Sequence, residues 1–312
     1  MRHSTPRLLC ALSAFILIGA SPAAALAQSD APDEVIHFTG PGGETVEGGV
    51  WLPAADGSPH PLVVISHGNS GWYRGHADTA EALAEAGFVV AALTHPGDNY
   101  QDQSRGLRLT GRAPQLSALI DYMTDGWSGP VAVDAQRIGA FGFSAGGFTV
   151  TSIIGGVSDA RAIQAHCAAE PEVFACRLIG AFGGLDLANW RPQARDARVK
   201  AAVIAAPALG LSFTDESLAA ITIPVQVWQA ADDLILPSPF NVEPVRDGLG
   251  GAVDYHRVEN AGHYDFLTPC EPRMQAAMPE LCTSAPAFDR AAFKRAFNAE
   301  VVRFFRQAMG EP

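Results

Sequence analysis

Residues 137–150 read Arg-Ile-Gly-Ala-Phe-Gly-Phe-Ser-Ala-Gly-Gly-Phe-Thr-Val, and the pattern G-x-S-x-G lies at their centre. The apolar run Arg137–Phe143 is typical of a buried strand, and the small residues after it favour a helix. A serine between strand and helix occupies a strained turn, and the two flanking glycines omit the Cβ atoms that would obstruct it. This order predicts that Ser144 is a nucleophile; the alternative is a tight glycine turn with an incidental serine.

A serine hydroxyl needs a base to remove its proton, and the pKa of histidine suits that task near neutrality. His263 is our candidate, because it lies in a late loop, Ala261-Gly262-His263-Tyr264. Gly262 would allow this loop to approach closely the strained turn at Ser144, which we call the elbow. The other histidines considered either end early strands, where they would support the pocket, or lie inside a strand: His67, His95 and His256.

The imidazole in turn needs a carboxylate that orients it and stabilises its cation. Asp232 and Asp233 both follow the expected strand Pro224–Trp228. We favour Asp233, because the apolar residues and proline after it return the chain to the fold, which would leave Asp232 solvated. The predicted catalytic residues are Ser144, Asp233 and His263.

Two backbone N–H groups must meet the oxyanion that forms when an acyl group is transferred. The residue after the nucleophile, Ala145, supplies one at a helix N-terminus, where negative charge is favoured. The loop Ser66-His67-Gly68-Asn69-Ser70-Gly71 follows an early strand, and the amide of Asn69 is the expected second donor. The alternative is that this loop is an ordinary glycine-rich turn.

Apolar runs alternate with helical patterns along most of the chain. Two early runs on either side of Gly40-Pro41-Gly42-Gly43 predict an edge hairpin. The later apolar strands, separated by helices, predict an α/β fold with a mostly parallel central sheet and helices on both faces. The expected strands are Val35–Phe38, Val46–Trp51, Leu62–Ile65, Phe88–Leu93, Arg137–Phe143, Ala201–Ala205, Pro224–Trp228 and Tyr255–Val258; the expected helices include Asp78–Ala86, Ala113–Met123 and Phe288–Met309.

The stretch 156–199 is longer than an ordinary connection between a helix and a strand. One interpretation is an inserted cap over the pocket, and the other is a surface excursion pinned by a disulfide. In either case residues 28–312 are expected to form a single domain, because the candidate catalytic groups are spread over most of that length.

The first 27 residues have the pattern of a secretory signal peptide. Arg2 and Arg7 precede an apolar run, Leu8–Ala20, and Ala25-Leu26-Ala27 has small residues at the cleavage spacing. The run is shorter than the ~20 residues that span a bilayer, so we expect no stable membrane anchor. The sequence thus predicts export of residues 28–312 to the periplasm or the medium.

Acidic residues outnumber basic ones, 33 to 21, and the formal net charge is −12. Cleavage after residue 27 removes two basic residues and no acidic one, which makes the charge more negative still. Nucleic acids and anionic membrane surfaces need a basic surface, so neither is an expected partner.

Four cysteines remain after the expected cleavage: Cys167, Cys176, Cys270 and Cys282. An even number in an exported chain favours disulfides, and proximity in sequence suggests the pairs 167 with 176 and 270 with 282, although three connectivities are open. Zinc-type ligand spacing does not accompany them, so no metal site is predicted.

Several motifs together resemble the predicted dienelactone-hydrolase-like branch of the α/β-hydrolases, which is also similar to platelet-activating-factor acetylhydrolase. These motifs are His67-Gly68-Asn69, Thr94-His95-Pro96-Gly97-Asp98-Asn99, Gly142-Phe143-Ser144-Ala145-Gly146-Gly147 and Gly262-His263-Tyr264-Asp265-Phe266-Leu267. The resemblance implies an ester hydrolase whose triad follows the order serine, acid, histidine. True dienelactone hydrolases carry a cysteine nucleophile, so Ser144 argues against dienelactones as substrates.

The expected activity is cleavage of a small-molecule carboxylic ester through an acyl-enzyme, without a metal or organic cofactor. An amidase or peptidase could use the same three residues. A non-catalytic binding protein that kept the fold is the alternative from another class.

Overall fold

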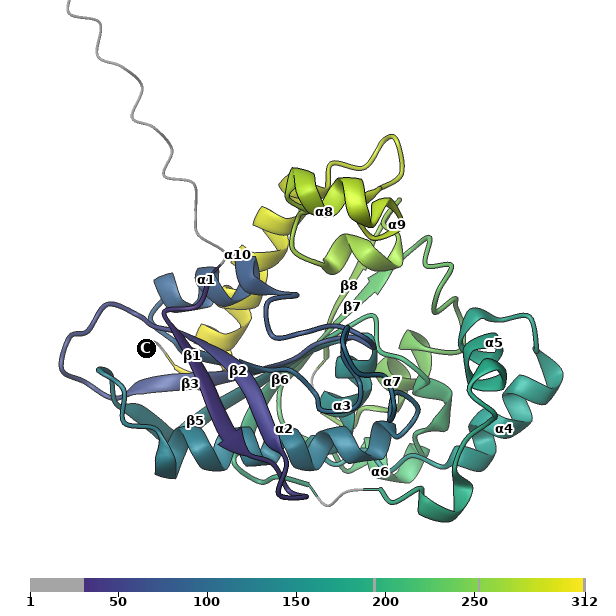
Figure 1. Ribbon diagram of the computed structural model, residues 1–312, viewed down its shortest axis with the longest axis horizontal. Coiled ribbons are helices and arrows are strands. Elements are labelled where there is room, and N and C mark those ends of the chain that lie inside the picture. Colours follow the sequence, from purple (N-terminus) through teal and green to yellow (C-terminus); the bar gives the residue numbers. More distant parts are fainter. Residues whose placement is uncertain (1–30, 193–194, 252, 311–312) are drawn as a thin grey trace, which may run out of the picture.

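The computed structural model describes residues 31–192, 195–251 and 253–310. Within them, eight strands form one sheet in the order β1-β2-β4-β3-β5-β6-β7-β8 (Figure 1). The predicted edge hairpin is formed by β1 and β2, β2 is antiparallel to β4, and the neighbours from β4 to β8 are parallel. The strands are β1 (Glu34–Thr39), β2 (Thr45–Trp51), β3 (His60–Ser66), β4 (Val89–Leu93), β5 (Val133–Phe143), β6 (Val199–Ala205), β7 (Val225–Ala230) and β8 (Val253–Val258). The expected signal peptide, residues 1–27, lies outside the described residues.

Helices cover both faces of this sheet (Figure 1). Among the described residues, no helix is both long and apolar enough to span a bilayer. The α-helices are α1 (Ala77–Glu85), α2 (Arg112–Asp121), α3 (Ala145–Ile153), α4 (Ala160–Ala169), α5 (Phe174–Ala181), α6 (Asp215–Ala219), α7 (Val242–Gly248), α8 (Pro272–Ala277), α9 (Pro279–Cys282) and α10 (Arg290–Met309); short turns are η1 (Leu109–Gly111), η2 (Tyr122–Gly126), η3 (Leu187–Asn189), η4 (Gly210–Ser212) and η5 (His263–Phe266).

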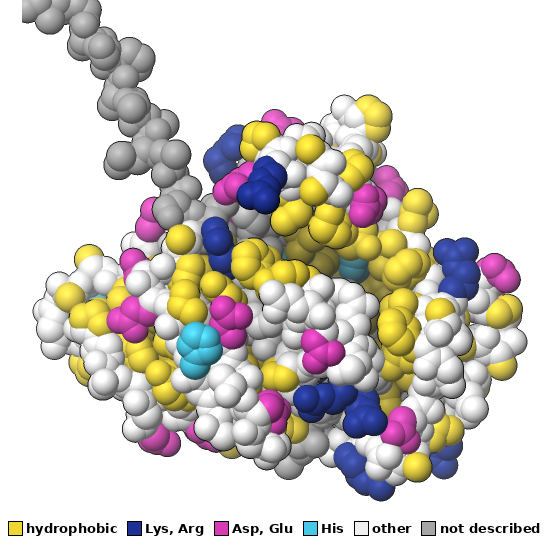
Figure 2. Space-filling model, in the orientation of Figure 1, with side chains coloured by type: hydrophobic (Ala, Val, Ile, Leu, Met, Phe, Trp, Pro, Cys, Tyr) yellow, Lys and Arg dark blue, Asp and Glu magenta, His cyan; other side chains and the backbone are white. Residues whose placement is uncertain are grey.

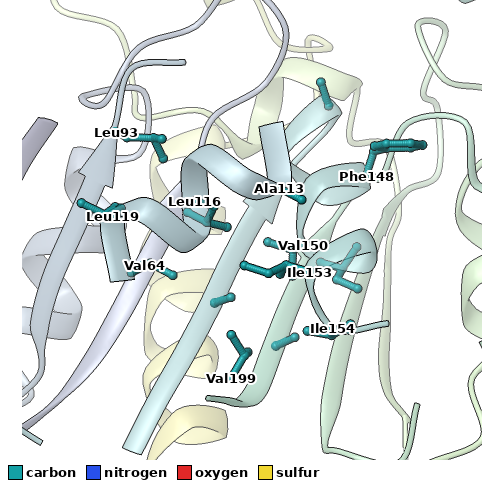
Figure 3. Packing of buried hydrophobic residues seen from close by; sticks show 14 of the residues in the cluster. Val64, Leu93, Ala113, Leu116, Leu119, Phe148, Val150, Ile153, Ile154 and Val199 are labelled. Carbon is teal, nitrogen blue, oxygen red and sulfur yellow. The ribbon is translucent and has the colours of Figure 1, made fainter. Parts of the chain in front are cut away.

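Alternate residues of β3 enter two separate apolar layers, because successive side chains of a strand point to opposite faces. Leu62 and Val64 pack with residues of α2 and α3, such as Leu116 and Phe148 (Figure 3). Val63 and Ile65 belong to the opposite layer, which includes residues of α1 and α10. The sheet is therefore buried on both faces, as its continuous apolar strands predicted.

The aromatic side of α10 closes the second layer. Phe297, Val301 and Phe305 are completely buried, and Phe297 makes an edge-to-face contact with Phe141 of β5. Full burial of such side chains contributes roughly 1.5–3 kcal/mol each. Helix α10 starts two residues later than predicted, because the Asp289 carboxylate accepts a hydrogen bond from the Ala292 N–H and caps it.

Two other predicted helices also have different ends. The predicted helix Asp78–Ala86 corresponds to α1, one residue earlier at each end. The predicted helix Ala113–Met123 ends as α2 at Asp121, and the chain continues as the wider turn η2. Strand β5 begins four residues before the predicted start at Arg137.

The long connection between α3 and β6 contains α4, α5 and η3, at one end of the molecule (Figure 1). A disulfide between Cys167 and Cys176 joins α4 to α5, with Cα atoms 5.1 Å apart. Phe182 and Leu187, which follow α5, are 50% and 40% exposed. The role of residues 156–199 as a cap over the pocket stays a prediction.

His76, at the start of α1, is buried in the second apolar layer. Its ring packs edge-on against Phe141 and Phe143. Burial, with help from the nearby Lys294 ammonium, lowers the pKa of His76 from 6.5 to about 3. The side chain is therefore neutral in the folded protein well below neutral pH.

This neutral histidine predicts a loss of stability in mild acid. Between its folded and unfolded pKa values, the unfolded state binds one more proton, so the free energy of unfolding falls by about 1.4 kcal/mol per pH unit. We expect His76→Phe to reduce the stability lost between pH 7 and pH 5 by about 2 kcal/mol, measured by urea unfolding at both pH values. His37→Phe, on the exposed face of β1, is the control; equal pH dependence in the His76 variant and the wild type would contradict the prediction.

Candidate active site

Ser144 connects β5 to α3 in a backbone conformation that is rare for a residue with a side chain, φ 56° and ψ −118°. A Cβ on Gly142 would lie 2.1 Å from the Gly146 carbonyl oxygen, and one on Gly146 would lie 1.9 Å from the Ser66 carbonyl oxygen. Only glycine fits either position. Strain of this kind costs on the order of 1–3 kcal/mol and persists only where surrounding structure enforces it.

The backbone of Ser144 is held by β6 and the residues after it. Its N–H donates to the Ala205 carbonyl (3.0 Å), and its carbonyl accepts from the N–H groups of Phe148 and Ala208 (3.1 and 3.0 Å). These bonds fix the elbow to the neighbouring strand and to its own helix. The side chain of Ser144 is thereby presented at the carboxyl end of the parallel strands.

The structure brings the three predicted catalytic side chains together. His263 Nε2 lies 3.0 Å from Ser144 Oγ, and His263 Nδ1 lies 2.6 Å from Asp233 Oδ2. An ionised carboxylate only accepts, so Nδ1 carries the proton and Nε2 is left to accept the one from Ser144. The hydrogen bonds form a continuous chain from acid to nucleophile.

Asp233 is buried and firmly oriented. Its Oδ1 accepts from the N–H groups of Ile235 and Leu236 (2.9 and 2.7 Å), which leaves Oδ2 for His263. Burial alone would raise the pKa of Asp233, but the charge and hydrogen bond of His263, together with the two amides, hold it below its ordinary value. Asp232 is exposed, and its N–H donates to the Ala261 carbonyl.

His263 opens the turn η5 and packs against Phe143, with ring centroids 4.8 Å apart. Gly262 is not a site of close backbone approach, so the prediction made for it is wrong. Its φ is −92°, and an added Cβ would make only an ordinary contact, 3.7 Å from Asp265 Oδ2. What fixes this turn is Asp265, whose Oδ2 accepts from the Gly262 N–H at 2.7 Å.

The loop with the second expected oxyanion donor lies directly beside the nucleophile. A Cβ on Gly68 would be 3.3 Å from the Cβ of Ser144. Asn69 is the next residue, and its side chain is turned to Asp98 (Nδ2 to Oδ1, 2.7 Å). Ala145 is the first residue of α3, where N–H groups have no partner within the helix. Both expected donors thus come from segments adjoining Ser144.

Two buried histidines support this loop, and their hydrogen bonds define the tautomer of each. His67 Nε2 accepts from the His95 backbone N–H (3.0 Å), so its Nδ1–H donates to the Gly68 carbonyl (2.6 Å). His95 Nδ1–H donates to Gln115 Oε1 (2.7 Å), and its Nε2 accepts from the Ser66 hydroxyl (2.8 Å). Burial, and next the charge of Arg112, hold the pKa values of both well below 6.5. These rings are neutral scaffolding.

The sequence predicted no role for Asp98 and Arg112, although they form a buried ion pair behind the same loop (2.5 Å). Arg112 shares the apolar side of α2 with Leu116 and Leu119, which are fully buried. A charged residue on an apolar helix stripe is the signal that could have drawn attention to it, because such a charge must find a partner.

A second disulfide lies close to the histidine turn. Cys270 and Cys282 are bonded, with Cα atoms 5.7 Å apart, and the closed segment contains α8 and α9. Helix α9 packs against η5, and Arg290 donates to the carbonyls of Leu281 and Leu267 (2.8 and 3.2 Å). Figure 2 shows a hollow with hydrophobic walls beneath this segment. The bridge therefore restrains the chain that follows His263.

One group of possible metal ligands occurs among the described residues: Asp254, His256 and Glu300. Arg303 already donates to both carboxylates, at 2.7 Å each. Asp254 and His256 lie within β8, whereas the triad lies beyond the carboxyl ends of the strands. The neighbouring guanidinium supplies the positive charge that these carboxylates need.

No protein-family model matches the chain. The curated protein "Cutinase est1" of Thermobifida alba is 27% identical over 228 residues, which cover 72% of this chain and 60% of that protein. The match thus spans less than two thirds of that relative.

Two solved structures show the same fold. One is a ferulic acid esterase from Streptomyces cinnamoneus (TM-score 0.58, 20% identity, 89% of this chain and 92% of that chain). The other is a puromycin-hydrolyzing peptidase from Mycobacterium tuberculosis (TM-score 0.58, 16% identity, 89% of this chain and 39% of that chain). The predicted α/β-hydrolase fold is confirmed, and the dienelactone-hydrolase-like branch stays a prediction.

The hydrogen bond between Asp233 and His263 predicts a clear ranking of two neighbouring acids. Asp233→Asn should lower kcat by ~10⁴-fold, because the amide cannot hold the imidazole in the required tautomer. Asp232→Asn, at the adjacent exposed position, is the matched control and should stay within about twofold of the wild type. Steady-state ester hydrolysis measures both, and a greater loss in the Asp232 variant would move the acid to that residue.

We predict that removal of the disulfide between Cys270 and Cys282 lowers activity while the protein stays folded. A loop of about a dozen residues contributes on the order of 2–4 kcal/mol, which a large core can lose without unfolding. Replacing Cys270 and Cys282 by serine should lower kcat by roughly 3- to 10-fold, because the turn that presents His263 loosens.

The matched variant replaces Cys167 and Cys176 by serine, and its kcat should fall less. Circular dichroism would verify that both proteins are folded. An unchanged kcat in the Cys270/Cys282 variant would show that this bridge serves stability alone.

Proposed function

We propose that this chain, an α/β-hydrolase by its fold, is a serine hydrolase that cleaves carboxylic esters through an acyl-enzyme. The observation that supports this most directly is the hydrogen-bond chain from Asp233 through His263 to Ser144, built on a strained elbow. A binding protein would have no need to hold a serine hydroxyl against a histidine at such a conformational cost. The function therefore rests on geometry as well as on residue types.

In the first half-reaction, Ser144 Oγ attacks the ester carbonyl carbon as His263 Nε2 takes its proton. The carbonyl oxygen gains negative charge and is met by the amides of Asn69 and Ala145. Asp233 stabilises the imidazolium while it exists. The imidazolium then gives its proton to the departing alcohol, and the acyl group remains on Ser144.

In the second half-reaction, His263 removes a proton from water, and the resulting hydroxide attacks the acyl-enzyme carbonyl. The same amides stabilise the second oxyanion. Collapse of that intermediate returns the proton to Ser144 and releases the carboxylic acid. Every proton transfer uses groups of this chain or water.

The comparisons favour an ester over an amide as substrate. The curated relative is named a cutinase, and the structural neighbour with matching length is named a ferulic acid esterase. The peptidase neighbour is 16% identical and is much longer than this chain, so its likeness concerns the fold. We infer a small or medium carboxylic ester, with acylated lipids and polyester fragments as candidate classes.

We also propose that the protein is exported and that residues 156–199 form a cap over the pocket. Two disulfides among the described residues suit an oxidising compartment, which supports export to the periplasm or the medium. The segment 156–199 also contacts the loop between β7 and α7, which contains Asp233: His166 of α4 packs against Phe240 of this loop, with ring centroids 4.5 Å apart. This contact supports a cap that borders the pocket.

Ser144→Ala tests the nucleophile. We expect kcat for a 4-nitrophenyl ester to fall by at least ~10³-fold, with the protein still folded, because the variant has no group to form the acyl-enzyme. Ser152→Ala is the matched control: Ser152 is a buried serine of α3 whose hydroxyl donates to the Phe148 carbonyl. That control should retain turnover.

Labelling with a fluorophosphonate probe and a panel of matched esters and anilides completes the test. The enzyme should be labelled in a Ser144-dependent manner, and it should cleave esters faster than anilides. Absence of labelling would contradict an enzymatic role, and faster cleavage of anilides would assign an amidase.

A further inference from the structure

The Asp98–Arg112 ion pair is buried behind the expected oxyanion loop. The two side chains are 4% and 3% exposed, and Arg112 Nη1 lies 2.5 Å from Asp98 Oδ2. Arg112 begins α2, and Asp98 lies in the loop after β4. Neither residue touches the triad in the described structure, so the chemistry derived above gives this costly pair no task.

Each arm of the Arg112 guanidinium reaches a different segment. Nη1 donates to Asp98, Nη2 donates to the His67 carbonyl, and Nε donates to Thr149 Oγ1 (3.0 Å). Thr149 in turn donates to the Ala145 carbonyl at 2.8 Å. One planar group thus connects the loop that follows β3 with the first turn of α3.

Asp98 holds the same loop from its other oxygen. Its Oδ1 accepts from Asn69 Nδ2 (2.7 Å) and from the Ser70 N–H (3.0 Å). Ser70 has a positive φ, 57°, which a non-glycine residue maintains only when contacts enforce it. The carboxylate therefore fixes the peptide groups on the C-terminal side of Asn69, while Arg112 fixes the carbonyl of His67.

The two expected oxyanion donors are far apart in sequence: the Asn69 amide follows β3, and the Ala145 amide begins α3. The distance of each N–H group from the oxyanion decides how strongly it stabilises the negative charge. Useful donors lie about 2.7–3.1 Å from the oxyanion, so small displacements are expensive. We infer that the Asp98–Arg112 pair is the positioning element that sets the Asn69 amide in register with the Ala145 amide. This inference rests on the proposed ester hydrolysis.

The chemistry of arginine explains why this position is not lysine. A guanidinium presents several N–H groups in one rigid plane, whereas an ammonium is a single point charge on a flexible stem. Lysine could neutralise Asp98, but it could not reproduce the three fixed directions to Asp98, His67 and Thr149. The relative position of the Asn69 and Ala145 amides should therefore depend on the planar shape of the Arg112 guanidinium as well as on its charge.

The test compares Arg112→Lys with a double variant, Asp98→Asn with Arg112→Gln, which leaves no buried unpaired charge. In both, kcat should fall by ~10- to 100-fold while KM stays within about threefold, because the oxyanion forms only after substrate binds. Affinity for a trifluoromethyl ketone, whose adduct with Ser144 bears an oxyanion, should fall by the same factor as kcat/KM. The value of kcat is calculated from the concentration of sites titrated with fluorophosphonate, so unfolded protein is excluded from the enzyme concentration.

The control is a second ion pair, at the end of β5 opposite to Ser144. Asp134 and Arg137 are 2.6 Å apart, and both lie on β5, outside the segment 156–199. Changing them to Asn and Gln should lower the melting temperature without changing kcat per titrated site.

Two results would overturn the positioning role: wild-type kcat in Arg112→Lys or in the Asp98/Arg112 double variant, or an equal loss of kcat in the Asp134/Arg137 control. Absence of Ser144-dependent ester turnover in the wild type would instead overturn the proposed function.

Discussion

The backbone of Ser144 depends on the close contact of the first turn of α3 with the end of β3 and on a hydrogen bond to β6. Gly146 lies against the Ser66 carbonyl so tightly that no side chain fits, and the Ser144 N–H is bonded to β6. These contacts exist only when β3, β5 and β6 are paired in their observed register. The strain at the elbow is therefore supported by the sheet and its two apolar layers, which are large enough to offset it.

Much of this arrangement could be predicted because it is encoded locally. The elbow is one continuous segment, and the acid and histidine follow strands whose carboxyl ends meet at one edge of a parallel sheet. Distances between side chains could not be predicted in the same way. The Asp98–Arg112 network joins segments that are far apart in sequence, and Asp289 shortens α10 through a capping bond that hydrophobic periodicity does not report.

The same limit explains the error at Gly262. The sequence places a glycine before the histidine, which resembles a site of close backbone approach, yet its φ is ordinary and an added Cβ would meet open space or ordinary contacts. The turn is shaped by the Asp265 carboxylate instead. A glycine can adopt backbone conformations that other residues avoid, and only the fold shows whether it adopts one of them.

The two disulfide-closed segments differ from the rest of the protein in how they are held. Residues 271–280 are all exposed, and α5 continues into an exposed stretch, so covalent bonds replace packing there. One segment adjoins the His263 turn, and α4, in which the other segment begins, packs against the loop after Asp233. Because these segments contribute little buried apolar surface, substitutions in them should leave the packing of the sheet and its helices intact, so the surroundings of the triad can be altered without rebuilding the core.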